Sequence, residues 1–151
     1  MDEWGLNLRD TSSITEYLGN WLWNSLDLGY TSVDIDDLMR FVGELCNSER
    51  AYVFEIDEAN GTISNTYEWC ALGVTPQKDL LQNESIFFVE GWIELFKQKK
   101  PVIIPNVEML KTNFPTVYAI LKPQNISSLV AVPVFFRDML LGFLGLDNPE
   151  H

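Results

Sequence analysis

The fold class is decided by two stretches, Arg50-Ala-Tyr-Val-Phe-Glu-Ile56 and Thr62-Ile-Ser-Asn-Thr-Tyr-Glu-Trp69. Both are rich in aromatic and β-branched residues, a composition typical of β-strands. The linker between them ends in Asn60-Gly61, a pair that supplies the positive φ angles a hairpin turn requires. The sequence therefore predicts an antiparallel hairpin at this place.

Two helices are predicted before the hairpin. The first spans Ser12 to Leu28, where Ser13 and Glu16 have the form of a capping box and apolar residues then recur at three- and four-residue steps. Because this helix is unusually apolar, it either packs on its own domain or pairs with a second subunit. The second helix is expected from about Asp34 to Asn47, with one apolar face.

Short helices and further strands are predicted after the hairpin. Helices are expected at residues 76–81, 87–99 and 114–122, and strands at residues 102–104, 128–136 and 139–146. The strand at 102–104 lies between Pro101 and Pro105, which suits a sheet edge because proline cannot donate to a ladder. The last two strands lack polar alternation, so both faces of the sheet are expected to be covered.

Five motifs in this order carry a family resemblance. They are Glu49-Arg50-Ala-Tyr-Val-Phe-Glu-Ile56 with the Asn60-Gly61 turn, Tyr67-Glu-Trp-Cys-Ala-Leu-Gly-Val-Thr-Pro76, Lys100-Pro-Val-Ile-Ile-Pro105, Ile126-Ser-Ser-Leu-Val-Ala-Val-Pro133 and Leu141-Gly-Phe-Leu-Gly-Leu-Asp-Asn148. Together they make the chain, from about Asp34 to Pro149, resemble the GAF domain family. The sequence around Trp69 is most similar to bacterial GAF input domains that lie upstream of diguanylate cyclase (GGDEF) or histidine-kinase modules.

The resemblance implies an α+β fold, in which an antiparallel sheet of five or six strands carries helices on both faces. Residues 1–31 would be an N-terminal helical segment that links and dimerises, and residues 32–151 the GAF domain, which lacks the C-terminal output helix with which family members continue. The implied function is a non-catalytic sensory input domain of a bacterial signalling protein. It would form a homodimer and relay to a downstream output domain.

Composition restricts the partners. The 151 residues fit one domain, and ten basic against twenty-two acidic residues give a net charge of −12. Such a chain repels a phosphate backbone, so no nucleic-acid role is expected. No apolar run approaches the roughly 18 residues of a membrane helix. The acidic start, Met1-Asp-Glu, is unlike a signal peptide, and we expect a cytoplasmic protein.

Catalytic motifs are missing from the sequence. The single histidine is the terminal His151, which leaves no Cys-His or Ser-His-Asp arrangement, so no enzyme activity is expected. Some GAF domains hold a bilin through a cysteine that usually has a histidine beside it. Here Cys70 lies between Trp69 and Ala71, and this argues against a bilin. No axial ligand for haem is evident either, so the cofactor stays unknown.

A ligand pocket is expected between the sheet and residues 75–122, where aromatic residues are dense. The residues predicted to bind the ligand are Tyr67, Trp69, Phe88, Trp92, Phe114, Tyr118, Ser128 and Val132. Such a pocket would hold a small apolar or amphipathic molecule. Two alternatives stay open: a ligand-free dimerisation module whose pocket is filled by side chains, and a cyclic-nucleotide-binding GAF domain, although its terminal Asn-Lys signature is replaced by Asn148-Pro149.

Overall fold

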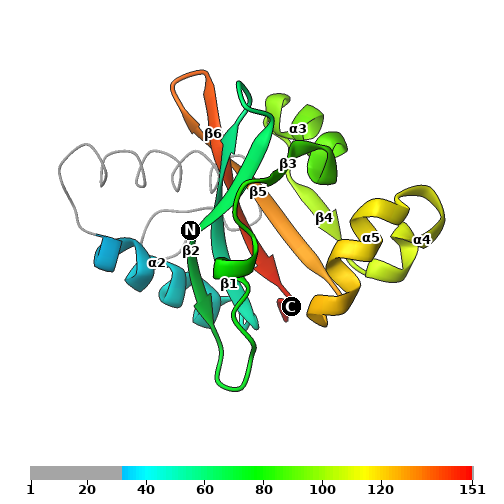
Figure 1. Cartoon of the computed structure of the whole chain (residues 1–151). Coiled ribbons are helices and arrows are strands. Elements are labelled where there is room, and N and C mark those ends of the chain that lie inside the picture. The colour runs from blue at the N-terminus through cyan, green and yellow to red at the C-terminus, as the bar shows by residue number, and fades with distance from the viewer. Residues whose placement is uncertain (1–31, 151) are drawn as a thin grey trace.

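The computed structural model describes residues 32–150, which form one six-stranded antiparallel sheet with helices on both faces (Figure 1). The strands are β1 (Arg50–Asp57), β2 (Thr62–Cys70), β3 (Glu84–Ser85), β4 (Val102–Ile104), β5 (Leu129–Phe136) and β6 (Met139–Asp147). Their order across the sheet is β3-β2-β1-β6-β5-β4. The predicted α+β class and strand number are confirmed.

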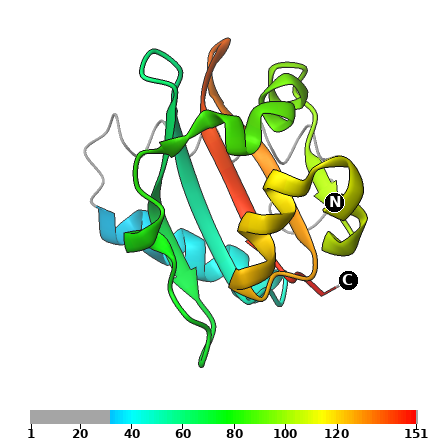
Figure 2. The same cartoon turned by 45° about the vertical axis from the view of Figure 1, so that its right-hand side comes forward.

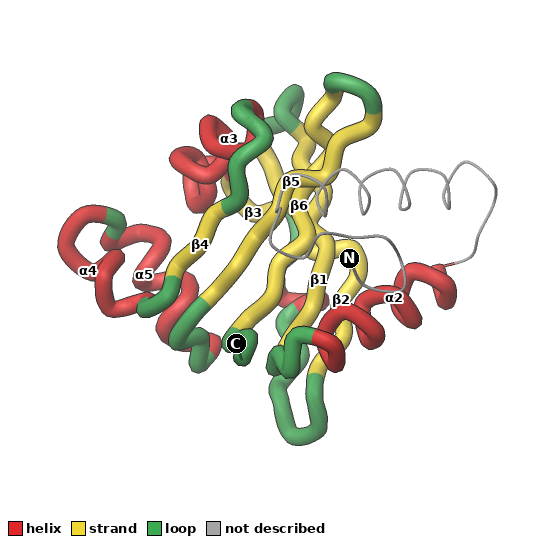
Figure 3. Tube along the Cα trace, turned by 180° about the vertical axis from the view of Figure 1, so that it is seen from behind, coloured by secondary structure: helices red, strands yellow, loops and turns green. Residues whose placement is uncertain are grey.

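The helices divide unequally between the two faces. One face carries only α2 (Ser32–Leu45) among the described residues, and the later helices cover the other face (Figures 2 and 3). These later elements are the 3-10 turns η1 (Lys78–Leu80), η2 (Ile86–Val89), η3 (Val107–Met109) and η4 (Lys122–Gln124), and the α-helices α3 (Glu90–Lys97), α4 (Leu110–Asn113) and α5 (Pro115–Leu121). Strands covered on both faces explain the missing polar alternation.

The predicted hairpin is present, with a different turn. The strand pair β1–β2 closes with Asp57 opposite Thr62, so four residues connect them. Of the Asn60-Gly61 pair only Gly61 has positive φ, at 66°. Asn60 donates its backbone N–H and its side-chain amide to the Asp57 carboxylate, and this local bonding holds the wider loop in place of a two-residue turn.

The predicted edge strand at residues 102–104 is confirmed, since β4 lies at one end of the sheet. β3 at the opposite edge and α4 were not predicted, because two and four residues are too few to produce a hydrophobic period. The predicted helix at 12–28 and its dimer contact lie outside the described residues. Within the described part of the chain, no helix is long and apolar enough to cross a membrane.

Two hydrophobic clusters lie on opposite faces of the sheet. The larger one packs β1, β5 and β6 against α3 and α5, with Phe143 stacked between Phe54, at 5.1 Å between ring centroids, and Phe96, at 5.3 Å. The smaller one packs Ile35 and Met39 of α2, both fully buried, against the other face. The larger cluster contains the candidate site.

Candidate ligand-binding site

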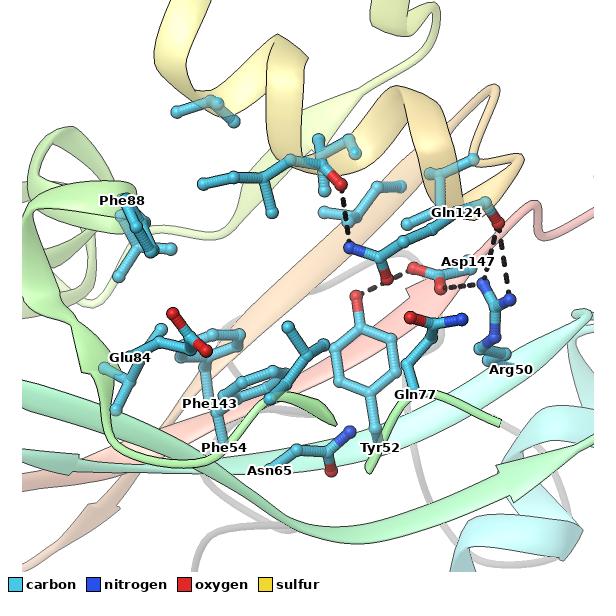
Figure 4. A pocket seen from close by; sticks show the side chains of 18 of the residues that line it. Arg50, Tyr52, Phe54, Asn65, Gln77, Glu84, Phe88, Gln124, Phe143 and Asp147 are labelled. Atoms are coloured by element: carbon cyan, nitrogen blue, oxygen red, sulfur yellow. Dashed lines mark hydrogen bonds and ion pairs between the residues drawn. The ribbon is translucent and has the colours of Figure 1, made fainter. Parts of the chain in front are cut away.

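A cavity of about 60 Å³ lies within the larger cluster, between the sheet and its covering segments (Figure 4). Its floor is formed by β1, β2 and β6, and its roof by η2, α3 and α5. A single water requires roughly 10–15 Å³ of such space, so the cavity holds about four to five non-hydrogen atoms. Pockets for drug-sized molecules measure roughly 300–1,000 Å³, and a ligand of that size requires the roof to move outward.

Aromatic rings form most of the apolar wall. Phe54 and Phe143 rise from the floor and Phe88 descends from η2 (Figure 4). Trp92 of α3 also lines the space. Trp92 meets the Phe143 ring edge to face, at 5.9 Å between centroids and 73° between planes. Both faces of Phe143 are covered by Phe54 and Phe96, so these rings give the space an apolar lining of ring atoms.

Arg50 closes one end of the cavity and uses its entire guanidinium on protein acceptors. Its Nε and Nη2 donate to the Thr75 carbonyl at 3.0 and 2.9 Å, and Nη1 and Nη2 donate to the Gln124 carbonyl at 3.2 and 3.3 Å. The remaining donor of Nη1 bonds Asp147 at 3.1 Å. A guanidinium has five N–H groups, so none is left for a ligand. Arg50, which is 3% exposed, thereby ties two covering segments to β1.

Asp147, at the end of β6, is 1% exposed and lies between Arg50 and Tyr52. The Tyr52 hydroxyl donates to its Oδ1 at 2.8 Å. Burial raises the pKa of Asp147 to about 6, while the bonds from Tyr52 and Arg50 act in the opposite direction. Burial and the Asp147 charge also raise the pKa of Tyr52 well above 10, which keeps its hydroxyl a donor. At pH 7 the Asp147 carboxylate is therefore ionised, and it is bonded to both Arg50 and Tyr52.

Five further polar residues line the cavity: Gln77 and Gln124, together with Glu68, Asn65 and Glu84. Glu68 accepts the backbone N–H groups of Gln77, at 2.9 Å, and Lys78, at 3.1 Å, so its charge is used to hold η1. Asn65 is 1% exposed, and its Oδ1 is buried with no hydrogen-bond partner in the described structure. Glu84 of β3 points its carboxylate into the space between Phe88 and Phe143 (Figure 4). Buried polar atoms are normally paired, so Asn65 is an exception that calls for an explanation.

A second hollow lies beside the cavity, at the outer surface. It is an open groove of about 580 Å³ between α3, β4 and the α4–α5 corner, and Phe87, Leu95 and Phe114 contribute exposed apolar surface to it. Trp92 and Val117 line both spaces. These two side chains are therefore part of the boundary between the groove and the cavity.

The structure brings together only part of the predicted site. Phe88 and Trp92 line the cavity, as expected. Phe114 lines the outer groove, and Tyr118 packs at the edge of the larger cluster with its hydroxyl 3.3 Å from Glu108. Ser128 lies at the base of the β5–β6 hairpin, where its N–H donates to the Asn148 side chain, and it does not line the cavity.

Tyr67, Trp69 and Val132 do not line the cavity either, because they pack with α2 on the opposite face. The cause for β2 is a β-bulge: Phe54 pairs with Asn65 but Val53 pairs with Tyr67, so Thr66 is an extra residue. One extra residue moves every following side chain to the other face. Without this bulge, a strict period of two would place Tyr67 and Trp69 beside Asn65, on the cavity side.

Sequence reasoning missed Arg50, Asn65 and Asp147. The available signal was a charged or amide residue inside or at the end of an apolar strand, because such residues are rarely buried without a partner. Asp147 directly follows the Leu141–Leu146 run, and its pairing with Arg50 of β1 depends on the register of β1 with β6. That register is not readable from either strand alone.

The two cysteines offer little reactivity. Cys46 and Cys70 are free and half-buried, and burial together with the nearby Glu68 charge raises the pKa of Cys70 to about 11. Its thiol is therefore protonated near neutral pH, and it is the thiolate that is nucleophilic. Among residues 32–150 no three His, Cys, Asp or Glu side chains are grouped closely enough to hold a metal ion.

Comparison with known proteins agrees with the resemblance seen in the sequence. The family model described as the GAF domain matches residues 35–151. A curated relative, the methanogenesis regulatory histidine kinase FilI of Methanothrix harundinacea, is 33% identical over 76% of this chain. The chain spans only 14% of that protein's length.

Solved structures with the same fold include cyanobacterial photoreceptor domains. The GAF3 domain of Slr1393 from Synechocystis matches with a TM-score of 0.67 at 21% identity over 80% of each chain. The PixJ GAF domain of Thermosynechococcus elongatus matches with a TM-score of 0.65 at 20% identity, over 80% of this chain and 71% of that one. A far-red absorbing domain, JSC1_58120g3, solved with bound biliverdin, gives 0.65 at 18% identity over 88% of this chain and 85% of that one.

These neighbours correct one expectation. The sequence argument against a bilin is contradicted, because a biliverdin-bound domain shares this fold over most of the chain. The missing histidine beside Cys70 is therefore not a reason to exclude that class of ligand. At such low identity the likeness establishes the fold, and it assigns no ligand to this chain.

Proposed function

The chain belongs to the GAF domain family, and on that premise we propose that it is a sensory input domain that binds a small molecule in the cavity between the sheet and its covering segments. The observation that carries the proposal is the cavity itself, an apolar space with an unpaired, fully buried polar atom on Asn65. An apolar space with a few directed polar groups is what small-molecule sites look like.

The hydrogen bonds of Tyr52, Asp147 and Asn148 support a structural connection between the cavity and the end of β6. Tyr52 lines the cavity and bonds Asp147, the last residue of β6. The next residue, Asn148, bonds Glu49, Asn125 and the N–H groups of Ser127 and Ser128. A ligand that displaces the Tyr52 ring would alter the bonds that hold the end of β6. For this to act as a signal, the ligand must bind the two arrangements with different affinity.

The similarity to a histidine kinase supports a place upstream of an output module. In a kinase of that class, binding in the cavity would change the activity of a catalytic module elsewhere in the chain, and the GAF domain itself would carry out no chemistry. The parent protein, expressed whole, is the material for that experiment: autophosphorylation is measured with and without a compound that this domain binds.

Thermal-shift screening against metabolites tests ligand binding directly, since a ligand that binds only the folded state raises the melting temperature. The matched variant is Val117→Phe, which places a larger side chain on a cavity-lining position of α5. Ala119→Val on the exposed side of the same helix is the control. We expect hits on the parent chain and the control but not on Val117→Phe. A library that stabilises none of the three contradicts the proposal.

A ligand-free dimerisation module is a second candidate, favoured by the outer surface of α2. Phe41 and Leu45 lie one turn apart on that helix, and they are 51% and 63% exposed. Large apolar residues grouped on one helix face are typical of interaction surfaces. Under this reading Phe41→Ser with Leu45→Ser lowers the dimer fraction in analytical ultracentrifugation, whereas Glu44→Ser, an exposed polar control on the same helix, leaves it unchanged.

A further inference from the structure

The charges that line the cavity are unevenly matched. Three carboxylates, on Glu68, Glu84 and Asp147, contribute to the lining, against the single guanidinium of Arg50. All five N–H groups of Arg50 are already bonded to Thr75, Gln124 and Asp147. Among residues 32–150, no other lysine or arginine lines the space. An anionic ligand would therefore find no free positive donor here, and it would approach a domain whose net charge is strongly negative.

Two groups of the cavity without a hydrogen-bond partner are acceptors, on Asn65 and Glu84, and the side-chain amide of Gln77 is a third group without one among the described residues. Asn65 is 1% exposed, and its Oδ1 has no hydrogen-bond partner in the described residues. The Glu84 carboxylate, on the short edge strand β3, has no hydrogen bond or ion pair among the described residues and points between Phe88 and Phe143 (Figure 4). Glu68 and Asp147 differ, since both are held by protein donors. Phe54, Phe88, Trp92 and Phe143 line the same space as Glu84, together with aliphatic side chains.

We infer that this cavity recognises a small organic cation, an alkylammonium group of about four or five non-hydrogen atoms, whose N–H or N–CH groups face Glu84 and Asn65 and whose alkyl groups contact the aromatic wall. A carboxylate beside several aromatic rings suits an alkylammonium group, because the carboxylate attracts the positive charge and the rings bury the alkyl groups. The inference rests on the proposed function and adds the charge class of the ligand. The cavity would recognise the ammonium group either in a free alkylammonium ion or at the end of a larger molecule.

The test compares tert-butylammonium with the isosteric tert-butanol and with pivalate, a larger anion. They present a cation, a neutral hydroxyl and an anion on one tert-butyl body. Calorimetric titration of the whole chain is run at concentrations up to about 100 mM, because a ligand of so few atoms binds weakly. We expect tert-butylammonium to bind with the highest affinity and to raise the melting temperature, tert-butanol to bind at least about tenfold more weakly, and pivalate not to bind.

Variants locate the effect. Glu84→Gln keeps the shape of the side chain and removes its charge, and it should weaken tert-butylammonium binding about tenfold while leaving tert-butanol unchanged. Glu94→Gln removes the same charge from an exposed position on α3 and should change neither. A melting temperature for each variant confirms that it is folded. N,N,N-trimethylglycinamide carries its ammonium group on a longer molecule, and it tests whether the cavity recognises the ammonium end of a larger ligand.

The outcomes separate the two proposals. Equal or tighter binding of tert-butanol or pivalate overturns the charge inference, as does an unchanged affinity of Glu84→Gln, and in both cases ligand binding itself stands. Binding by none of the three compounds, with a metabolite hit that Val117→Phe abolishes, also overturns only the charge inference. If none of the three compounds binds and no metabolite stabilises the chain, both the charge inference and the proposed ligand binding are overturned.

Discussion

Asp147 is the residue at which burial and pairing oppose each other most directly. Burial raises its pKa from 3.8 to about 6 even though Arg50 and Tyr52 both bond the carboxylate. Between those two pH values the folded chain binds a proton that the unfolded chain has released. The stability contributed by this carboxyl is therefore fully present below about pH 4 and is lost as pH rises through about 6.

Asp147→Asn removes this titration and keeps the shape of the side chain. Relative to the variant, the parent chain should lose about 2–3 kcal/mol of unfolding free energy between pH 4 and pH 7, since each pKa unit corresponds to about 1.4 kcal/mol. Urea unfolding at several pH values measures the difference. Asp138→Asn, at the exposed β5–β6 turn, should run parallel to the parent chain. If the unmutated chain instead gains stability relative to Asp147→Asn as pH rises from 4 to 7, the ion pair outweighs burial.

We expect Asn65 to lower the stability of the ligand-free fold. Its Oδ1 is buried and unpaired, and such a group costs about 1–3 kcal/mol of stability. Asn65→Leu should therefore raise the unfolding free energy by about 1 kcal/mol or more, because the adjoining cavity leaves room for the larger side chain. The same variant should lose binding of any compound found by the thermal-shift screen. A lower stability would mean that the amide is satisfied in the ligand-free protein.

Strands β1 and β6 pack closely at Gly145, where the Tyr52 ring leaves no space for a Cβ atom. A Cβ on Gly145 would lie 2.1 Å from Cε2 and 2.4 Å from Cζ of the Tyr52 ring, which is itself only 6% exposed. Gly145→Ala must therefore displace that ring from Asp147. We expect a loss of about 2 kcal/mol or more in unfolding free energy, measured by chemical denaturation.

Gly91 in α3 provides the matched control, because a Cβ there has no atom within 4 Å. Gly91→Ala should leave stability unchanged or raise it by up to about 1 kcal/mol, since alanine favours the helix. Equal effects of Gly91→Ala and Gly145→Ala would remove the case for a close Tyr52–Gly145 contact.

The elements also show how far sequence reasoning reaches. Strong local patterns placed β1, β2, β4, β5, β6 and the helix α2 within about two residues, because burial of one or both faces leaves a readable period in the chain. The cavity wall was harder. A single bulged residue, Thr66, places Tyr67 and Trp69 on the α2 face, and nothing in the composition of β2 marks where the phase changes. Phe88 and Trp92, which the sequence predicts to contact a ligand, line the cavity.

On the scale of the whole molecule, the sheet separates two environments. The α2 face is a packed core with an exposed apolar helix surface, suited to contact with another segment or subunit. The other face contains the cavity, its unpaired acceptors and the bonds that lead to Asn148. We therefore propose that ligand binding takes place on the face covered by α3 and α5, and assembly on the face covered by α2.

Trp92 and Trp69 report on these two faces separately, since Trp92 lines the cavity and Trp69 packs against α2. The most direct test is a titration followed by ¹H–¹⁵N NMR of the indole N–H groups, assigned by Trp92→Phe and Trp69→Phe. Addition of tert-butylammonium, or of a metabolite found in the screen, should shift the Trp92 signal in a saturable way and leave the Trp69 signal in place. A saturable shift of Trp69 with Trp92 unmoved would contradict the account, because the ligand would then lie on the α2 face.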